Sequence, residues 1–202
     1  MVNIFLQGMG VGAGLIIAIG AQNAFVLTQG IRRQHHWLIA GICSFSDMLL
    51  IFAGAAGVGG IVAAKPALQT GAAWTGALFL FWLGVKACRG ALAGNHLQER
   101  QEVAAGLRTA VLTTLALTFL NPHVYIDTLL LLGSIGGQYR EMERMTFALG
   151  ASVSSFLWFF SLSIGGTLLA PLFQKSMAWR ILDLVVWITM WTIAWQLVAM
   201  AS

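Results

Sequence analysis

Six long apolar stretches, separated by short polar connections, constrain the fold of this chain more than any other feature. They cover about residues 3–29, 37–62, 66–92, 109–137, 146–171 and 178–200. A hydrocarbon layer roughly 30 Å thick is crossed by about 20 residues of α-helix, at about 1.5 Å rise per residue. Each stretch is therefore predicted to be a transmembrane helix, and the chain an all-α integral membrane protein.

The composition leaves little room for a soluble domain. Hydrophobic residues make up 58% of the 202 residues and charged residues only 9%, which is outside the range of soluble globular domains. The longest connection, a loop over about residues 93–108, is too short to fold alone. The first stretch has no Lys or Arg ahead of its apolar run, so it is interpreted as a span and not as an export signal. We expect one transmembrane domain over residues 1–202.

The positive charges lie mainly in alternate loops. Of the eleven Lys and Arg residues, only Lys65, Arg140 and Arg144 belong to loops 2 and 4. By the positive-inside rule, loops 1, 3 and 5 are cytoplasmic, and both termini are expected outside, in the periplasm. The net charge of +4 then reflects orientation and attraction to the lipid bilayer, so no nucleic-acid partner is expected.

The two halves of the chain look like a divergent repeat of three spans each. Repeat 1 covers about residues 1–92, and repeat 2 about residues 109–202. Asn23 and Asn121 each lie in a polar interruption of the first span of their half. Because three is odd, a tandem copy enters the membrane in the opposite orientation, as in many secondary transporters. The sequence thus predicts six transmembrane helices arranged as two inverted three-helix repeats.

Spans 1 and 4 are expected to be broken or kinked. The segment NPHVYID in span 4 contains Pro122, which lacks an amide hydrogen and crowds the preceding turn. The segment GAQNAF in span 1 begins at Gly20 and carries the adjacent amides of Gln22 and Asn23. Backbone exposed at such breaks must be satisfied by protein or by a hydrated cavity, so discontinuous spans tend to line substrate sites. A helix N-terminus exposed there would also attract a carboxylate.

Two carboxyls are predicted to lie near the middle of the membrane. Asp47 in span 2 and Asp127 in span 4 are each about ten residues, or roughly 15 Å, from the nearer surface. An intramembrane acid costs about 2.5 to 3.5 kcal/mol on insertion scales and usually faces the bundle interior. No Lys or Arg occupies an interior position to neutralise both acids. We expect a cationic ligand or protons to do so; an interhelical pair that holds the bundle together is the alternative.

Other polar residues near the two acids complete the predicted site. The predicted substrate-binding residues are Gln22, Asn23, Ser44, Asp47, Asn121, Tyr125 and Asp127, and the predicted proton-coupling residues are Asp47, His123 and Asp127. His123 lies one helical turn before Asp127 and titrates near neutrality in its reference state, although it could equally cap the break. Cys43 and Cys88 have no metal-binding spacing, so neither a metal nor a cofactor is expected.

Three segments resemble the signature segments of the LysE/ArgO family of basic amino acid exporters. They are GAQNAFVLTQGIRR (20–33), CSFSDMLLI (43–51) and NPHVYIDTLLLLGSIGGQ (121–138). The resemblance implies a multi-pass carrier of the bacterial cytoplasmic membrane that exports L-arginine or L-lysine, and toxic analogues such as canavanine. This chain has Ala21 where the family usually has proline, so a softer break is expected in span 1.

The membrane potential indicates how such a carrier is driven. Moving one positive charge outward against an interior-negative potential costs about 2.3 kcal/mol per 100 mV. Because the sequence contains no Walker motif, we expect an ion gradient to supply this energy. The hypothesis is antiport, in which Asp47 and Asp127 bind the substrate cation and protons in alternation.

Other functions are left open by the residues alone. One alternative is a neutral amino acid exporter of the homoserine or threonine type, and another is a divalent-cation exporter that uses Asp47, Asn121, His123 and Asp127. A protease dyad of the two aspartates is disfavoured because no Gly-x-Gly-Asp sequence follows, so the chain is not expected to be an enzyme. A homodimer is also left open.

Overall fold

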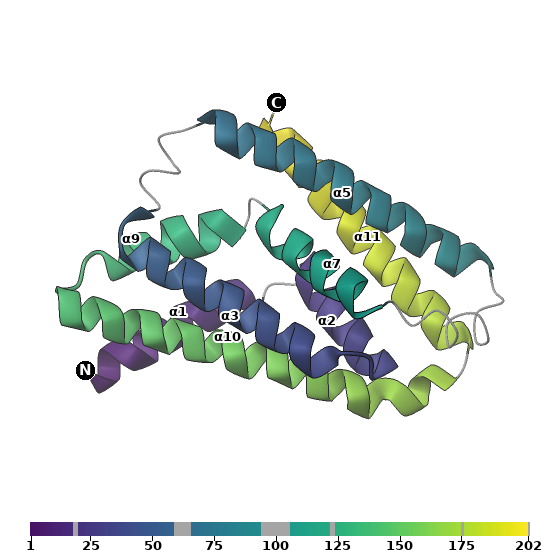
Figure 1. The fold of residues 1–202 in the computed structure, drawn as a ribbon, viewed down its shortest axis with the longest axis horizontal. Helices are drawn as coiled ribbons and strands as arrows, with labels where there is room; N and C mark the ends of the chain where they lie inside the picture. Colours follow the sequence, from purple (N-terminus) through teal and green to yellow (C-terminus); the bar gives the residue numbers. More distant parts are fainter. Residues whose placement is uncertain (18–19, 59–65, 94–105, 122–123, 175, 202) are drawn as a thin grey trace.

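The computed structural model describes residues 1–17, 20–58, 66–93, 106–121, 124–174 and 176–201. Across these residues all regular elements are helical (Figure 1). The first half contains α1 (Val2–Ile16), α2 (Ala21–Arg32), α3 (His36–Ala55) and α5 (Pro66–Ala93). The second half contains α7 (Leu107–Phe119), the π-helix η1 (Tyr125–Leu132), α9 (Gly133–Gly136), α10 (Glu141–Leu169), the 3₁₀-helix η2 (Ala170–Gln174) and α11 (Ser176–Ala201). Pro122 and His123, predicted as helix breaker and proton carrier, lie outside the described residues.

Four to five membrane spans follow from the lengths and composition of these helices. Helices α3, α5, α10 and α11 each contain an apolar segment long enough to cross a membrane. Helices α1 and α2 pass the same test only as a pair, bent by 85°. The fourth predicted span, residues 109–137, consists of shorter apolar helices. The protein is therefore an all-helical membrane protein in which two of the predicted spans are interrupted.

The interruption of span 1 places the two adjacent amides at the start of a helix. Gly20 is the N-cap of α2 and has an extended backbone, with φ −124° and ψ 171°. Gln22 and Asn23 therefore lie in the first turn of α2. The bend is sharp even though Ala21, and not proline, begins this helix.

The interruption of span 4 is bridged by a tyrosine. Helix α7 ends at Phe119, and the π-helix η1 covers Tyr125–Leu132. The hydroxyl of Tyr125 donates a hydrogen bond of 2.7 Å to the carbonyl oxygen of Phe119, one of the last carbonyls of α7, which have no partner inside that helix. Beyond the break the chain forms a π-helix, a conformation that is frequent at functional sites.

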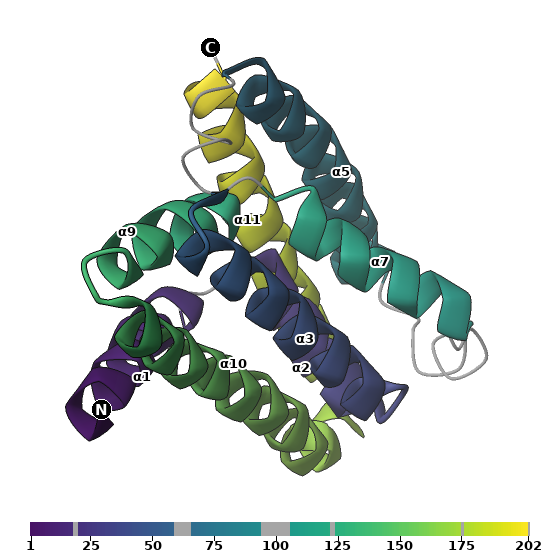
Figure 2. The same ribbon diagram turned by 60° about the vertical axis from the view of Figure 1, so that its left-hand side comes forward.

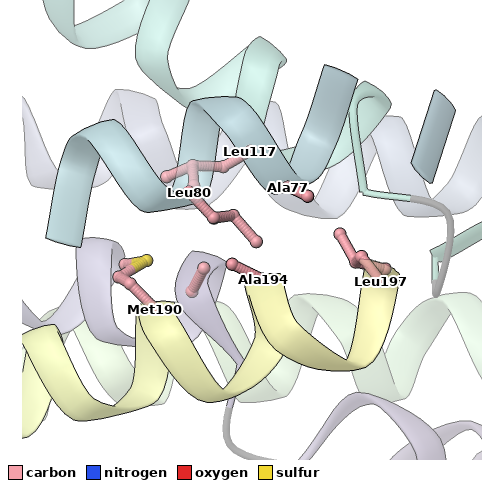
Figure 3. Packing of buried hydrophobic residues seen from close by; sticks show 7 residues of the cluster. Ala77, Leu80, Leu117, Met190, Ala194 and Leu197 are labelled. Atoms are coloured by element: carbon pink, nitrogen blue, oxygen red, sulfur yellow. The ribbon is translucent and has the colours of Figure 1, made fainter. Parts of the chain in front are cut away.

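Helix α10 is the scaffold of one part of the molecule, where it packs along α1, α2 and α3 (Figures 1 and 2). Helices α5 and α11 lie side by side in both views and form a second part. A cluster of buried aliphatic side chains joins the pair to the rest through α2 and α7. It contains Ala21, Ala77, Leu80, Leu117, Met190, Ala194 and Leu197 (Figure 3).

Glycines allow several of these helices to approach to backbone contact. A Cβ atom on Gly166 of α10 would lie 2.7 Å from the carbonyl oxygen of Leu27 and 2.8 Å from the Cα of Gly30, both in α2. A Cβ atom on Gly133 of α9 would lie 2.7 Å from the carbonyl oxygen of Gly54 in α3. Such small-residue contacts are how membrane helices associate closely without a hydrophobic driving force.

Candidate functional site

A cavity of about 240 Å³ lies where the two interrupted spans meet α3, α10 and α11. Gly20 lines it at the break of span 1. The cavity is also lined by five of the predicted substrate-binding residues, namely Gln22, Asn23, Asp47, Asn121 and Asp127. The fold thus brings both carboxyls and three amides, from both halves of the chain, to one place.

Asp47 is buried in α3 and is held from the neighbouring helix α10. Its side chain is 4% exposed, and the fully buried hydroxyl of Ser155 donates a hydrogen bond of 2.9 Å to its Oδ2 atom. Hydrogen bonds to charged groups are stronger than neutral ones. Ser155 therefore fixes the orientation of this carboxyl with respect to the cavity.

Asp127 reaches the same cavity from span 4. It is half-buried and lies in the first turn of η1. An acid in the first turn of a helix complements the partial positive charge of the helix N-terminus. Within the described residues, two carboxyls and no Lys or Arg line the cavity.

Asn23 holds the two sides of the span 1 break together. Its Nδ2 atom donates a hydrogen bond of 3.1 Å to the carbonyl oxygen of Ile16, the last residue of α1. Its Oδ1 atom accepts a hydrogen bond of 3.3 Å from the Nε1 atom of Trp158 in α10. The side chain therefore satisfies a terminal carbonyl of α1 and anchors α2 to α10.

Gln22, the other amide of the pair, has a different environment. Its side chain is 8% exposed, and its Nε2 atom is buried with no hydrogen-bond partner among the described residues. The thiol of Cys43 is near enough to interact with it, but a thiol is only a weak acceptor. A buried amide donor left in this state costs free energy unless a ligand or water satisfies it.

Two of the predicted site residues are placed differently. Ser44 is fully buried, and its hydroxyl donates a hydrogen bond of 2.9 Å to the carbonyl oxygen of Ala40 in the same helix. Tyr125 bridges the span 4 break. Neither residue is part of the cavity lining that the structure describes.

The structure adds residues that the sequence analysis did not assign to the site. Gln196 and Ile193, one turn apart on α11, line the cavity; an amide within an apolar span was the signal for Gln196, as it was for Gln22. For Ser155 the sequence offers a weaker indication of a role in the site. The sequence CSFSD at 43–47 resembles ASVSS at 151–155, so aligning the two halves of the chain places Ser155 at the position of Asp47.

Comparisons with known proteins agree with the resemblance noted in the sequence. Residues 13–201 match the model of a family described as LysE type translocator. Proteins named "Arginine exporter protein ArgO" from Salmonella schwarzengrund (strain CVM19633), Salmonella typhi and Salmonella typhimurium (strain LT2) are each 42% identical over 198 residues, covering 98% of this chain and 94% of the relative. No solved structure matches. The chain therefore belongs to the LysE type translocator family.

Proposed function

We propose that the protein is a secondary active exporter of cationic amino acids, with L-arginine as its main substrate and L-lysine as a second, in the bacterial cytoplasmic membrane. The observation that carries this proposal is the cavity in which Asp47 and Asp127 meet, with no Lys or Arg in its described lining. The 42% identity to proteins named arginine exporters supports it over nearly the full chain. Both findings favour a transporter over an enzyme, and a cationic over a neutral amino acid.

The size of the cavity fits a single small solute. Its volume of about 240 Å³ is below the 300–1,000 Å³ that is usual for pockets that hold drug-sized ligands. Arginine carries two cationic groups and one carboxylate. Two carboxyls and several amides in one cavity supply partners for all three.

Proton antiport is the mechanism that we propose for the energy supply. The substrate cation binds against ionised Asp47 and Asp127 on the outward step, and protons neutralise the same carboxyls on the return. His123, next to this site in the sequence, is proposed to relay the protons. The cost of moving a cation against the potential is thus met by the inward flow of protons.

Two contacts support the proposed orientation, with both termini in the periplasm. The guanidinium of Arg32, at the end of α2, lies 5.4 Å from the ring centroid of Trp179, at the start of α11, so loops 1 and 5 lie on one side. Arg144, which is assigned to loop 4 and lies in the first turn of α10, donates a hydrogen bond of 3.4 Å to the carbonyl oxygen of Ala55 at the end of α3. The end of α3 and the start of α10 therefore lie close together, which agrees with the distribution of Lys and Arg.

The pattern of helix contacts supports the two inverted repeats. Helices of span 1 pack on span 5, and those of span 4 pack on span 2. Span 2 also packs on span 5, and span 3 on span 6. Exchanging spans 1, 2 and 3 with spans 4, 5 and 6 leaves this set of contacts unchanged, as expected for two related halves.

Efflux of radiolabelled arginine tests the proposed function. Cells that express the protein are expected to release preloaded arginine faster than cells that carry an empty vector. In proteoliposome counterflow, unlabelled arginine should compete with the label and threonine should not. An inward-directed proton gradient should accelerate export, so a flux that ignores the gradient would contradict antiport while leaving the substrate assignment intact.

Removal of the Ser155 hydroxyl is expected to weaken substrate binding through Asp47. In Ser155→Ala, the half-saturating arginine concentration should rise about tenfold, because a hydrogen bond to a charged group is lost. Ser155→Thr keeps a hydroxyl and should restore most of the affinity. Ser152→Ala is the matched control, since this buried hydroxyl donates to Ala148 of its own helix at 2.8 Å and its loss should change the value by less than about twofold. Equal effects of both alanine variants would assign Ser155 to packing alone.

A further inference from the structure

Span 1 resumes after its break with a helix N-terminus next to the cavity. Helix α2 begins there, beside the cavity-lining residue Gly20. Its first turn contains no acid. The N-cap of α2, Gly20, has no side chain, and no side-chain hydrogen bond caps this helix. The N-terminus of α2 therefore keeps its partial positive charge.

Helix geometry leaves backbone donors at this end of α2. The amide of Ala24 donates to the carbonyl oxygen of Gly20 at 3.1 Å, which is the first bond of the helix. The amides of Ala21 and Gln22 precede it and have no acceptor within the helix. Since Gly20, Gln22 and Asn23 line the cavity, these donors are next to the space that a substrate would occupy.

The side chain of Gln22 provides a second and independent indication of a ligand. It is 8% exposed, it lines the cavity, and its Nε2 atom has no hydrogen-bond partner in the part of the chain that the structure describes. The neighbouring Asn23 is different, because its amide nitrogen donates to the carbonyl oxygen of Ile16. Of the two adjacent amides, Asn23 therefore closes the break, whereas Gln22 keeps an unsatisfied donor in the wall of the cavity.

Resting on the proposed function, we propose that the N-terminus of α2 and the amide nitrogen of Gln22 form the subsite for the α-carboxylate of the substrate. Asp47 and Asp127, which line the same cavity, then bind the cationic groups. The site then has partners for both the carboxylate and the cationic groups of an amino acid, whereas a simple amine lacks the carboxylate. The carrier should consequently discriminate between arginine and cations of the same shape that lack the carboxylate.

Competition measurements with two arginine analogues test this proposal. Agmatine is arginine without its carboxylate, and L-argininamide carries a neutral amide in its place. Against labelled arginine in proteoliposomes, both should need concentrations about thirtyfold higher than unlabelled arginine for half-inhibition, because each loses hydrogen bonds to a charged acceptor. Equal competition by arginine, agmatine and argininamide would overturn the subsite.

Two variants of Gln22 link the discrimination to the proposed subsite. Gln22→Leu should raise the half-inhibitory concentration of arginine about tenfold and leave that of agmatine unchanged. Gln22→Glu has nearly the same shape and places a negative charge at the subsite, so it should weaken arginine further while agmatine binds at least as well. Because agmatine does not use the subsite, its retained binding reports an intact cavity in both variants.

Gln196→Leu is the matched control, since Gln196 is an amide that lines the same cavity from α11. It should change the values for arginine and agmatine by the same factor. If Gln22→Leu also changed the half-inhibitory concentrations of arginine and agmatine by the same factor, the proposed subsite would be overturned. If the wild type neither bound nor exported arginine, the proposed function itself would fail, which is distinguishable from a protein that transports arginine and agmatine equally well.

Discussion

Arginine efflux is expected to fall at least about thirtyfold when Asp47 or Asp127 is replaced by asparagine, because removing one partner of a buried charge pair costs 2–5 kcal/mol or more. Asp47 is 4% exposed, and both side chains line the cavity. Asparagine keeps the size and the hydrogen-bonding capacity of the side chain and removes only its charge. The change therefore isolates the electrostatic contribution to substrate binding.

The measurement is efflux of radiolabelled arginine from preloaded cells, normalised to the amount of protein in the membrane. Asp183→Asn is the matched control, because this acid on α11 is also buried, at 9% exposure, and is not part of the cavity lining. Asp183→Asn should leave efflux per molecule within about twofold of the wild type, because sites without shared partners act independently. Normal efflux by both Asp47→Asn and Asp127→Asn would show that the cavity is not the substrate site.

The second large effect is expected at the crossing of α2 and α10. Gly166→Val should reduce the free energy of unfolding by about 3 kcal/mol, because the new side chain overlaps backbone atoms that cannot move aside. Its Cβ atom would lie 2.7 Å from the carbonyl oxygen of Leu27 and 2.8 Å from the Cα of Gly30. The displaced α2 would take Gln22 and Asn23 away from the cavity, so transport should be lost together with stability.

Gly165→Val provides the control for this change. A Cβ atom at Gly165 has no described neighbour within 4 Å, so the same substitution one residue away meets open space. Thermal unfolding of the two purified variants in detergent compares them directly. A similar melting temperature for both would contradict close packing at this crossing.

The sequence locates two of the four uninterrupted spans closely, whereas α3 (His36–Ala55) and α10 (Glu141–Leu169) differ from the predicted 37–62 and 146–171 by up to seven residues. For the predicted spans 66–92 and 178–200, α5 (Pro66–Ala93) and α11 (Ser176–Ala201) differ by at most two residues at either end. In both cases an apolar run of bilayer length is bounded by polar residues. A single physical property, apolar length, is enough to predict such a helix.

The interrupted spans show the limit of that property. Hydropathy treats residues 3–29 as one span, although α1 ends at Ile16 and α2 begins at Ala21 at a bend of 85°. The segment GAQNAF predicts a break in span 1, but it does not predict which of the two amides bonds across the break. Asn23 closes the break by a hydrogen bond to Ile16, seven residues earlier, and this division of roles depends on where the chain bends.

Contacts between the two halves of the chain are hardest to predict. Ser155 donates to Asp47 across 108 positions of sequence, and Trp158 donates to Asn23 across 135. Composition and periodicity describe one helix at a time, so they carry no information on which residue of α10 faces α3. Ser44 illustrates the same limit, because it is predicted to bind substrate while its hydroxyl donates to a carbonyl of its own helix.

Competition between arginine and citrulline tests the central claim, that two carboxyls in one cavity are balanced by a cationic passenger. Citrulline has nearly the shape of arginine but carries a neutral ureido group in place of the guanidinium. In proteoliposome counterflow with labelled arginine, half-inhibition by citrulline should require a concentration at least about thirtyfold higher than half-inhibition by arginine. Equal competition by the two compounds would contradict this account.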